Sequence, residues 1–360
     1  MKQRNILIAL AVLILMVVVV IFFTSSLQKQ YPKIVVEEAP VTVPVTVTET
    51  ALEEVPVTEI ALSGPVADKS AEISGLAWLG NNLLLLPQYP QVFDENGDGF
   101  LYYLPSVEIT NYLDGTSQTP LEPRPIQLVA SDLAGKIPNF QGFESIGSAG
   151  LSIFLTIEAG EGTDMHGYLI AGTISPDLSV LLLDTNNLTE IPTQAKSANH
   201  ADESILVLQD EIITFYETNG DLIVKEPVAH KFGFDLKPLD TIPMTNLEYR
   251  LTDTTPLSLT EFWGINYFFP GDEDLAPLKD PIAEAFGKGE SQANYAQVER
   301  LVKFQINNEG ITVVDTAPIS LALVEDARNW EGLAFLYGRG FLIATDKFPA
   351  TMLGFVPFSK

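Results

Sequence analysis

Acidic residues recur in this chain as pairs with a nearly constant separation. Three such pairs are Glu144 with Glu158, Glu203 with Glu217, and Glu331 with Asp346. The first two pairs are 14 residues apart and the third is 15 apart. Carboxylates gathered at one place repel one another, so they need raised pKa values, basic neighbours or a bound cation. Because oxygen ligands favour Ca²⁺ or Mg²⁺, we predict a divalent-metal site; alternatively, these acids only brace strand ends by accepting hydrogen bonds.

A second acidic segment has the spacing of a calcium loop. Asp94, Asn96 and Asp98 alternate along the chain and Gly99 follows them, which matches the opening of an oxygen-ligand Ca²⁺ loop. The twelfth position is Pro105 instead of glutamate, which excludes a complete EF-hand. We predict Asp94, Asn96 and Asp98 as further metal ligands, while a plain β-turn remains the alternative.

The acid pairs bracket short apolar runs, and this pattern predicts the fold. A separation of 14 residues with a turn in the middle is typical of a β-hairpin, which places both marked residues at the same end of paired strands. Copies begin near residues 74, 144, 203, 248 and 331, and the last gap predicts a hidden copy near 290. Hairpins repeated around an axis form a β-propeller. We therefore predict an all-β propeller, most simply with six blades, over a β-sandwich or two smaller β domains.

A propeller must also close its ring. Residues 57–62 form a short β-branched run after a proline-rich segment, and residues 352–358 form the last apolar run of the chain. Pairing of these two runs would join the chain ends in one blade and cover exposed strand edges. The propeller domain is therefore predicted to span residues 57–360.

Composition excludes several functional classes. The chain has 360 residues, no cysteine, and 20 Lys and Arg against 47 Asp and Glu, which gives a net charge of −27. Thiol catalysis, thiolate zinc sites and disulfides are impossible without cysteine. A basic surface for nucleic acid is absent from this composition, so we predict no nucleic-acid partner. Hydrophobic residues make up 46% of the chain, which is too apolar for a disordered acidic polymer.

The N-terminal region has the pattern of a membrane anchor. Lys2 and Arg4 precede an unbroken apolar run of 18 residues, 6–23, which is about 27 Å long as a helix. We predict that residues 1–30 are an uncleaved signal anchor and that residues 31–56, rich in Val, Thr, Glu and Pro, are an extended stalk. The predicted location is the cell membrane, crossed once, with a monomeric C-terminal domain outside the cytoplasm.

Three segments resemble the phytase-like β-propeller family, also called "esterase-like activity of phytase". They are EISGLAW at residues 72–78, FESI at 143–146 and NWEGLA at 329–334, followed by a closing stretch at 346–355. The family's last motif commonly carries an Asp-Asn pair where this chain has Asp346 and Lys347. The first copy also has Ser74 and Gln88 where the other copies have carboxylates. The resemblance covers about residues 65–358 and implies hydrolysis of an ester or phosphoester.

Two functions are compatible with these patterns. The first is a membrane-tethered, metal-assisted hydrolase of small esters or phosphoesters that uses the ring of acids. The second is a non-catalytic propeller that binds a protein, peptide or glycan at the cell surface. The net charge of −27 opposes anionic substrates, because few cations are available to hold phosphate.

Overall fold

The apolar runs between the paired acids fold as antiparallel β-hairpins, as their spacing predicts. The computed structural model describes residues 51–94 and 97–358, which belong to one compact unit, residues 49–360. Strand β8 (Ser152–Glu161) is buried over most of its length. A continuous apolar run is typical of a strand covered on both faces, and this is the position of the hairpins between neighbouring sheets.

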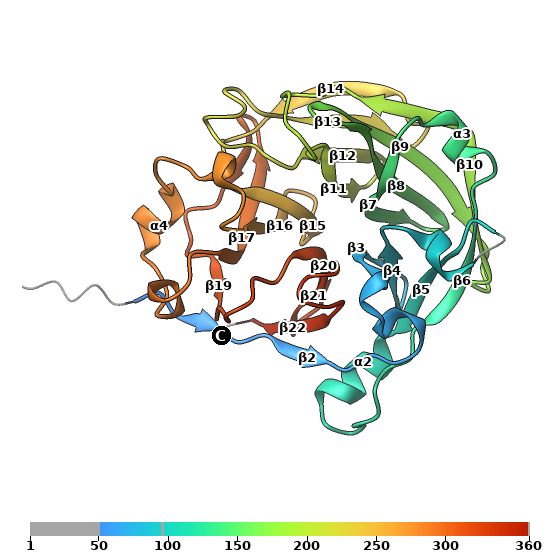
Figure 1. Ribbon diagram of the computed structural model, residues 1–360, viewed down its shortest axis with the longest axis horizontal. Helices are drawn as coiled ribbons and strands as arrows, with labels where there is room; N and C mark the ends of the chain where they lie inside the picture. Colours follow the sequence, from blue (N-terminus) through green and yellow to red (C-terminus); the bar gives the residue numbers. More distant parts are fainter. Residues whose placement is uncertain (1–50, 95–96, 359–360) are drawn as a thin grey trace, which may run out of the picture. The chain divides into compact units, whose positions relative to one another are not determined.

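The strands form five antiparallel units around a central axis (Figure 1). The first unit contains β3 (Ile73–Leu79), β4 (Asn82–Pro87), β5 (Phe100–Pro105) and β6 (Arg124–Val129). The second contains β7 (Phe140–Ala149), β8, β9 (Asp164–Ile174) and β10 (Val180–Ile191). The third contains β11 (Asp202–Leu208), β12 (Glu211–Tyr216), β13 (Val228–Gly233) and β14 (Pro238–Pro243). The outer strands β6 and β10 pair in parallel and so join the first two units into one sheet.

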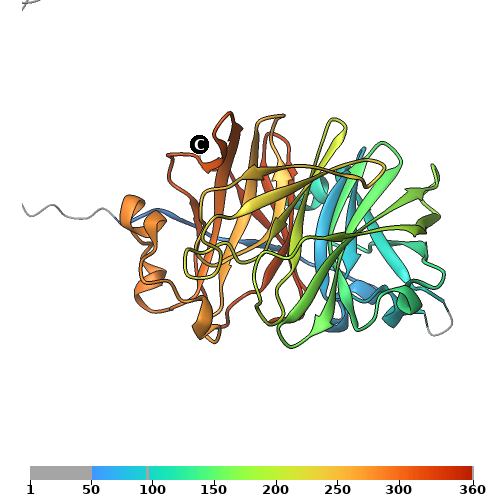
Figure 2. The same cartoon turned by 90° about the horizontal axis from the view of Figure 1, so that it is seen from above.

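The last two units include strands from the N-terminal end of the described chain. The fourth contains β15 (Arg250–Pro256), β16 (Glu261–Phe268), β17 (Val298–Asn307), β18 (Gly310–Val313), β19 (Ile319–Leu321) and β1 (Glu54–Val55). The fifth contains β20 (Trp330–Leu336), β21 (Gly340–Thr345), β22 (Leu353–Pro357) and β2 (Thr58–Ile60). In a view turned by 90°, the strands run across the thickness of the ring (Figure 2).

The first strands of the units contact one another in a closed ring. Strand β3 contacts β7, β7 contacts β11, β11 contacts β15, β15 contacts β20, and β20 contacts β3. An apolar layer fills the space between each neighbouring pair of units, so that five buried clusters alternate with five units. Radial repetition of small antiparallel sheets is the architecture of a β-propeller. The prediction of an all-β propeller is therefore confirmed.

The predicted count of six blades is not reproduced by the described residues, which supply five units. The stretch near residue 290, where a hidden copy was expected, holds helix α4 (Pro281–Phe286) and the short helix η5 (Ser291–Ala293). This segment is an insertion between β16 and β17. Asp280 caps α4 by accepting hydrogen bonds from the backbone N–H groups of Ile282 and Ala283. A capped helix with proline in its first turn cannot supply a hairpin, so the long gap between copies reflects an insertion.

The two ends of the described chain meet in the fifth unit, as predicted. Strand β2 pairs antiparallel with β22, and Thr58 lies opposite Phe355 and Ile60 opposite Leu353. Strand β1, residues 54 and 55, pairs with β19 although it falls inside the predicted stalk of residues 31–56. The last residues of that segment therefore belong to the sheets of the propeller.

The remaining helices are short and lie between strands. They are η1 (Pro65–Ala67), η2 (Lys69–Ala71), η3 (Pro90–Phe93), α2 (Ser106–Leu113), α3 (Leu133–Lys136) and η4 (Glu273–Leu275). Within the described residues, no helix has both the length and the apolar character needed to cross a membrane. The predicted signal anchor, residues 1–30, and most of the predicted stalk lie outside the described residues.

Candidate functional site

The residues marked by the repeat sit at β-bulges in the innermost strands. In β3, β7, β11 and β20, the pairing with the next strand slips once near the beginning of the strand. The residues left without a pairing partner there are Ser74, Glu144, Glu203 and Glu331. A bulge re-aims a side chain out of the regular alternation of a strand. Three acids from three units are thereby directed to one end of the ring.

The fourth unit departs from this pattern. Its innermost strand β15 slips between Leu251 and Thr254, and the acid at that place is Asp253. The Asp253 carboxylate is buried and accepts hydrogen bonds from the Leu333 backbone N–H at 2.7 Å and from the Ser145 hydroxyl at 3.3 Å. It therefore ties neighbouring innermost strands together. Glu248, considered as the start of this copy, accepts a hydrogen bond from the backbone of Asp221 and does not line the central pocket.

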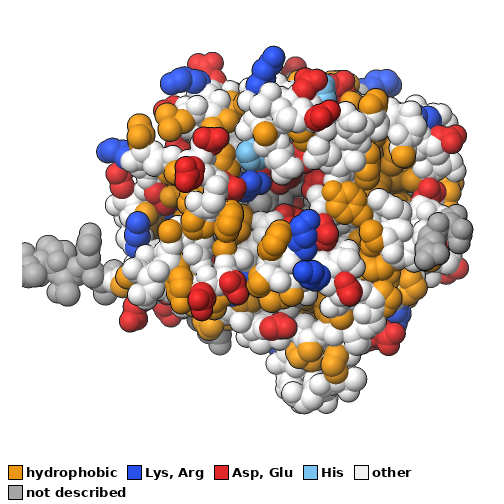
Figure 3. Space-filling model, viewed as in Figure 1, with side chains coloured by type: hydrophobic (Ala, Val, Ile, Leu, Met, Phe, Trp, Pro, Cys, Tyr) orange, Lys and Arg blue, Asp and Glu red, His pale blue; other side chains and the backbone are white. Residues whose placement is uncertain are grey.

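A pocket of about 660 Å³ lies at the end of the ring where the bulges are. Five of the six paired acids line it, namely Glu144, Glu158, Glu203, Glu331 and Asp346. Its other lining residues include Gln88, Tyr89, Asn199, Arg250, Tyr267, Phe269, Asp272, Asn329, Lys347 and Phe348. Figure 3 shows a hollow near the centre of the face, with acidic side chains in and around it. We call this cavity the central pocket.

Burial controls the charge of the acids on one side of the central pocket. Glu144 is 5% exposed, and this burial raises its pKa to about 7, although the Gln88 amide donates a hydrogen bond to it. Burial raises the pKa of Glu158 to about 9, with further contributions from the charges of Glu144 and Glu217. Both side chains therefore hold a proton over part of the neutral pH range.

The remaining acids of the pocket are shifted in the same direction. Loss of solvent raises the pKa values of Glu203 and Glu331 well above their usual range. Burial also raises the pKa of Asp346, but the Phe348 backbone N–H donates to its carboxylate at 2.8 Å and opposes the shift. Asp346 thus has a hydrogen bond that favours its ionised form, as expected for an acid that keeps its charge.

Cations around the pocket are already paired. Arg250 binds Glu217 with one nitrogen and Asp272 with another, the latter at 2.9 Å. Lys347 lies 3.2 Å from Glu72. Arg328, the third cation that could neutralise the acids by sequence, binds the buried Glu299 instead, beneath Trp330. Among the described residues that line the central pocket, Arg250 and Lys347 are the only cations.

Glu217 has a different role from the other paired acids. Its side chain is fully buried, and one carboxylate oxygen is occupied by Arg250. The other oxygen, Oε2, has no hydrogen-bond partner within the described chain and lies 3.8 Å from Nε2 of His200. The pairing spacing placed Glu217 beside the cluster correctly, while its contacts separate it from the pocket wall.

The predicted calcium loop does not join this cluster. Asn96 lies outside the described residues, and Asp94 and Asp98 are not lining residues of the central pocket. The Asp98 carboxylate accepts a hydrogen bond from the backbone N–H of Ala130 at 2.7 Å. Glu108, which could have supplied a later ligand, pairs with Arg124 instead. In the described part of the chain, no three His, Asp or Glu side chains are arranged so that they could hold one metal ion.

Sequence reasoning missed the uncharged half of the pocket. Tyr89, Asn199, Tyr267 and Asn329 line it beside the acids. Burial and the charge of Glu144 raise the pKa of Tyr89 to about 12, so its hydroxyl is a donor at neutral pH. Asn329 donates to Glu331, two residues further along the chain. These side chains come from loops that adjoin the strand ends, and loops carry no periodic signal.

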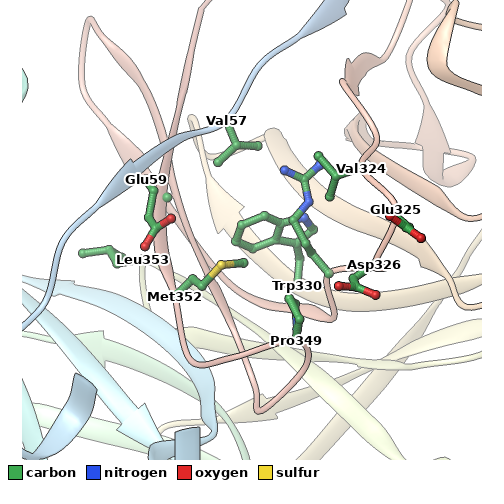
Figure 4. Close-up of a pocket in the computed structure, with 11 residues that line it drawn as sticks. Val57, Glu59, Val324, Glu325, Asp326, Trp330, Pro349, Met352 and Leu353 are labelled. Atoms are coloured by element: carbon green, nitrogen blue, oxygen red, sulfur yellow. The ribbon is translucent and has the colours of Figure 1, made fainter. Parts of the chain in front are cut away.

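A second cavity of about 350 Å³ adjoins the central pocket and shares Asp326 and Pro349 with it. Figure 4 shows Trp330 among its lining residues, with Val57 and Glu59 of the N-terminal segment on one side. The Trp330 ring is buried and its indole N–H donates to Glu299 at 2.8 Å. This cavity therefore extends the hollow outward between the last two units.

Comparisons with known proteins give no family. No family model matches the chain, and no curated protein matches it. The resemblance to the phytase-like family therefore stays a prediction.

Several solved structures are similar in fold at very low identity. One is a Bombyx mori GH32 β-fructofuranosidase mutant, with 13% identity and a TM-score of 0.43, covering 81% of this chain and 63% of that one. A putative glycoside hydrolase from Parabacteroides distasonis has 11% identity and a TM-score of 0.46, covering 87% of this chain and 99% of that one. A Cellvibrio cellulosa α-L-arabinanase mutant has 10% identity and a TM-score of 0.41, covering 79% and 90%. The chain thus spans less than two thirds of the first of these proteins.

Proposed function

We propose that the protein is a hydrolase of uncharged substrates and that the central pocket is its active site. The observation that carries this proposal is the protonation pattern of the pocket. Glu144, whose pKa lies at about 7, shares the pocket with Asp346, whose hydrogen bond favours the ionised form. Titratable groups whose environments push their pKa values apart are the usual arrangement for acid and base catalysis.

Roles for the two acids follow from their charge states. Glu144 donates a proton to the leaving oxygen of the substrate, because a general acid works best with a pKa near the working pH. Asp346 takes the proton of the attacking water. The charge of Asp346 contributes to the raised pKa of Glu144, so the two groups lie close enough to act on one bond.

Charge selects the substrate class. Five acids line the central pocket against two cations, both of which are paired with other acids. A phosphate group would meet this negative field without a free arginine to hold it. Tyr89, Asn199, Tyr267 and Asn329 offer hydrogen bonds and aromatic faces that suit an uncharged, hydroxyl-rich molecule.

The test is turnover by the full chain of p-nitrophenyl acetate and p-nitrophenyl glycosides against p-nitrophenyl phosphate. We expect cleavage of an uncharged substrate and none of the phosphate. Glu144→Gln should lower kcat by about 100-fold or more, because it removes the acid but keeps its shape. Glu309→Gln, in an exposed turn, is the matched control and should retain full activity. Absence of turnover on all uncharged substrates, or full activity of Glu144→Gln, would refute the proposal and favour a non-catalytic propeller that binds a peptide or glycan.

A second candidate is hydrolysis assisted by a divalent cation. Oε1 of Glu158 favours it, because this oxygen is buried in the pocket wall and has no partner in the described structure. The ligands would be Glu144, Glu158, Glu203, Glu331 and Asp346, whose oxygens suit Ca²⁺ or Mg²⁺. The cation would polarise the carbonyl of an ester. A chelator should then abolish activity, whereas acid and base catalysis by the carboxyl groups should survive it.

We also propose the cellular setting from the sequence. The charged start and the apolar run at residues 6–23 favour a single membrane anchor with the propeller outside the cytoplasm. The full chain should then remain in the membrane fraction after a high-salt wash. A shortened chain in the soluble extracytoplasmic fraction would show that the segment is removed.

A further inference from the structure

The segment between β10 and β11 carries a serine and a histidine in direct contact. The Ser197 hydroxyl lies 2.6 Å from Nδ1 of His200. Asn199, between them, lines the central pocket, so this segment forms part of the pocket wall. Ser197 is partly exposed and His200 is 7% exposed. A reactive hydroxyl at this position is within reach of a ligand, while its partner is shielded from water.

A carboxylate faces the other nitrogen of the same histidine. Nε2 of His200 lies 3.8 Å from Oε2 of Glu217, which is longer than a hydrogen bond. Neither atom has a hydrogen-bond partner in the described residues, and both are buried. Two unsatisfied buried polar atoms that face each other form a bond after a small movement, and catalytic hydrogen bonds are often long before a substrate binds.

The tautomer of His200 follows from these neighbours. The Glu217 carboxylate can only accept a hydrogen bond, so it favours the proton on Nε2. The lone pair of Nδ1 then points at Ser197 and accepts its hydroxyl proton. Burial lowers the pKa of His200, although Glu217 opposes this, so the imidazole is neutral and can act as a base.

We propose that Ser197, His200 and Glu217 form a nucleophile, base and carboxylate relay that cleaves uncharged carboxylic esters. This inference rests on the proposed function of the central pocket and names the substrate class. Arg250 holds the second oxygen of Glu217, so the carboxylate is fixed in place. The relay uses the same order of groups that activates serine in unrelated hydrolases.

The reaction is balanced without a cofactor. Oγ of Ser197 attacks the ester carbonyl carbon while its proton moves to Nδ1 of His200. The bond between the carbonyl carbon and the alcohol oxygen then breaks, and the alcohol leaves with that proton. Water attacks the acyl-serine in the same way, gives a proton to Nδ1, and releases the carboxylic acid while Ser197 regains its proton.

Covalent labelling tests the nucleophile. The full chain is incubated with an alkyl fluorophosphonate, and the adduct is located by intact-mass measurement and peptide mapping. We expect one adduct per chain on Ser197, none in Ser197→Ala, and a labelling rate at least about tenfold lower in His200→Gln. Ser148→Ala is the matched control. The Ser148 hydroxyl is equally partly exposed and makes a bond of 2.6 Å, but to the Trp78 carbonyl oxygen, so this change should leave labelling intact.

A second variant measures the base without requiring turnover. The chain contains no cysteine, so Ser197→Cys introduces a single thiol. If His200 abstracts its proton, this thiol should react with iodoacetamide at pH 7 about tenfold faster than the thiol of Ser148→Cys. Adding His200→Gln should remove the difference.

Glu217 acts through His200 and is a positioning residue. Glu217→Gln should lower kcat for p-nitrophenyl butyrate by about tenfold or more with KM unchanged, and Glu217→Asp should restore part of the loss. A merely structural role would lower the melting temperature without separating kcat from KM.

The outcomes separate this inference from the proposed function. Unchanged ester cleavage by Ser197→Ala together with loss of activity in Glu144→Gln would overturn the relay and leave the central pocket as the active site. Equal thiol reactivity at positions 197 and 148 would also overturn it. No turnover and no adduct in the wild-type chain would overturn both.

Discussion

Glu144 and Glu158 link the chemistry of the central pocket to the stability of the protein. Their pKa values in the folded state, about 7 and about 9, exceed the usual value of 4.5. The folded state therefore binds protons more tightly than the unfolded state, and its stability is highest below pH 4.5. Stability falls as pH rises from 4.5 to about 7 for Glu144 and to about 9 for Glu158. We expect the melting temperature to rise when the pH is lowered from 8.5 to 6.

Isosteric variants identify the source of this pH dependence. Glu158→Gln mimics the protonated acid, so it should raise the melting temperature at pH 8.5 and flatten the profile. Each 1 kcal/mol gained corresponds to about 2–4 °C in a domain of this size. Glu309→Gln, in an exposed turn, changes the net charge equally and should leave the slope unchanged. Parallel profiles for Glu158→Gln and the wild type would contradict the assignment.

At the scale of the elements, closure of the ring depends on a three-residue strand. Strand β2 pairs with β22, and its Ile60 is 1% exposed in the apolar layer between the fifth and first units. Ile60→Ala should lower the free energy of unfolding by about 2–4 kcal/mol, because it leaves a cavity where the chain ends meet. Chemical denaturation monitored by tryptophan fluorescence gives this quantity.

Glu59 provides the matched control on the same strand. Its side chain is exposed, so Glu59→Ala should change stability by no more than about 0.5 kcal/mol. Equal effects at positions 59 and 60 would show that β2 is dispensable for closure. In that case, removal of the last ten residues, which include β22, would also leave a folded domain.

At the scale of the whole molecule, the net charge of −27 opposes compaction. Mutual repulsion of the acids destabilises the folded state, and salt screens it over a Debye length of about 10 Å at 0.1 M. We expect the melting temperature to rise by several degrees between 20 and 300 mM NaCl, measured by scanning fluorimetry at pH 8. A melting temperature that is independent of salt would show that the charges are too far apart to interact.

The same measurement distinguishes screening from a specific cation. At equal ionic strength, CaCl₂ and NaCl should stabilise the protein equally if only screening operates. A larger shift with CaCl₂, reduced in Glu158→Gln, would support a bound ion, because a ligand held only by the folded state stabilises it by mass action.

Local spacing in the sequence determined the repeating hairpin and the approach of its acids. A strand and its partner must lie side by side after a short turn, so Glu144 and Glu158, 14 residues apart, share one strand end. The apolar run of β22 and the short run of β2 were also recognisable as strands. These features depend on neighbours in the chain, and sequence periodicity reports them directly.

Tertiary packing alone decided the number of units and the partners of the buried polar groups. The gap before residue 298 is filled by a helical insertion, whose length a repeat count reads as a further blade. Glu217 lies beside Arg250 and His200, and Asp253 binds Leu333, because innermost strands from different units converge. Which buried donor meets which acceptor depends on contacts between residues far apart in the chain. Spacing within one hairpin carries no information about them, so the relay of Ser197, His200 and Glu217 emerges only when the ring is closed.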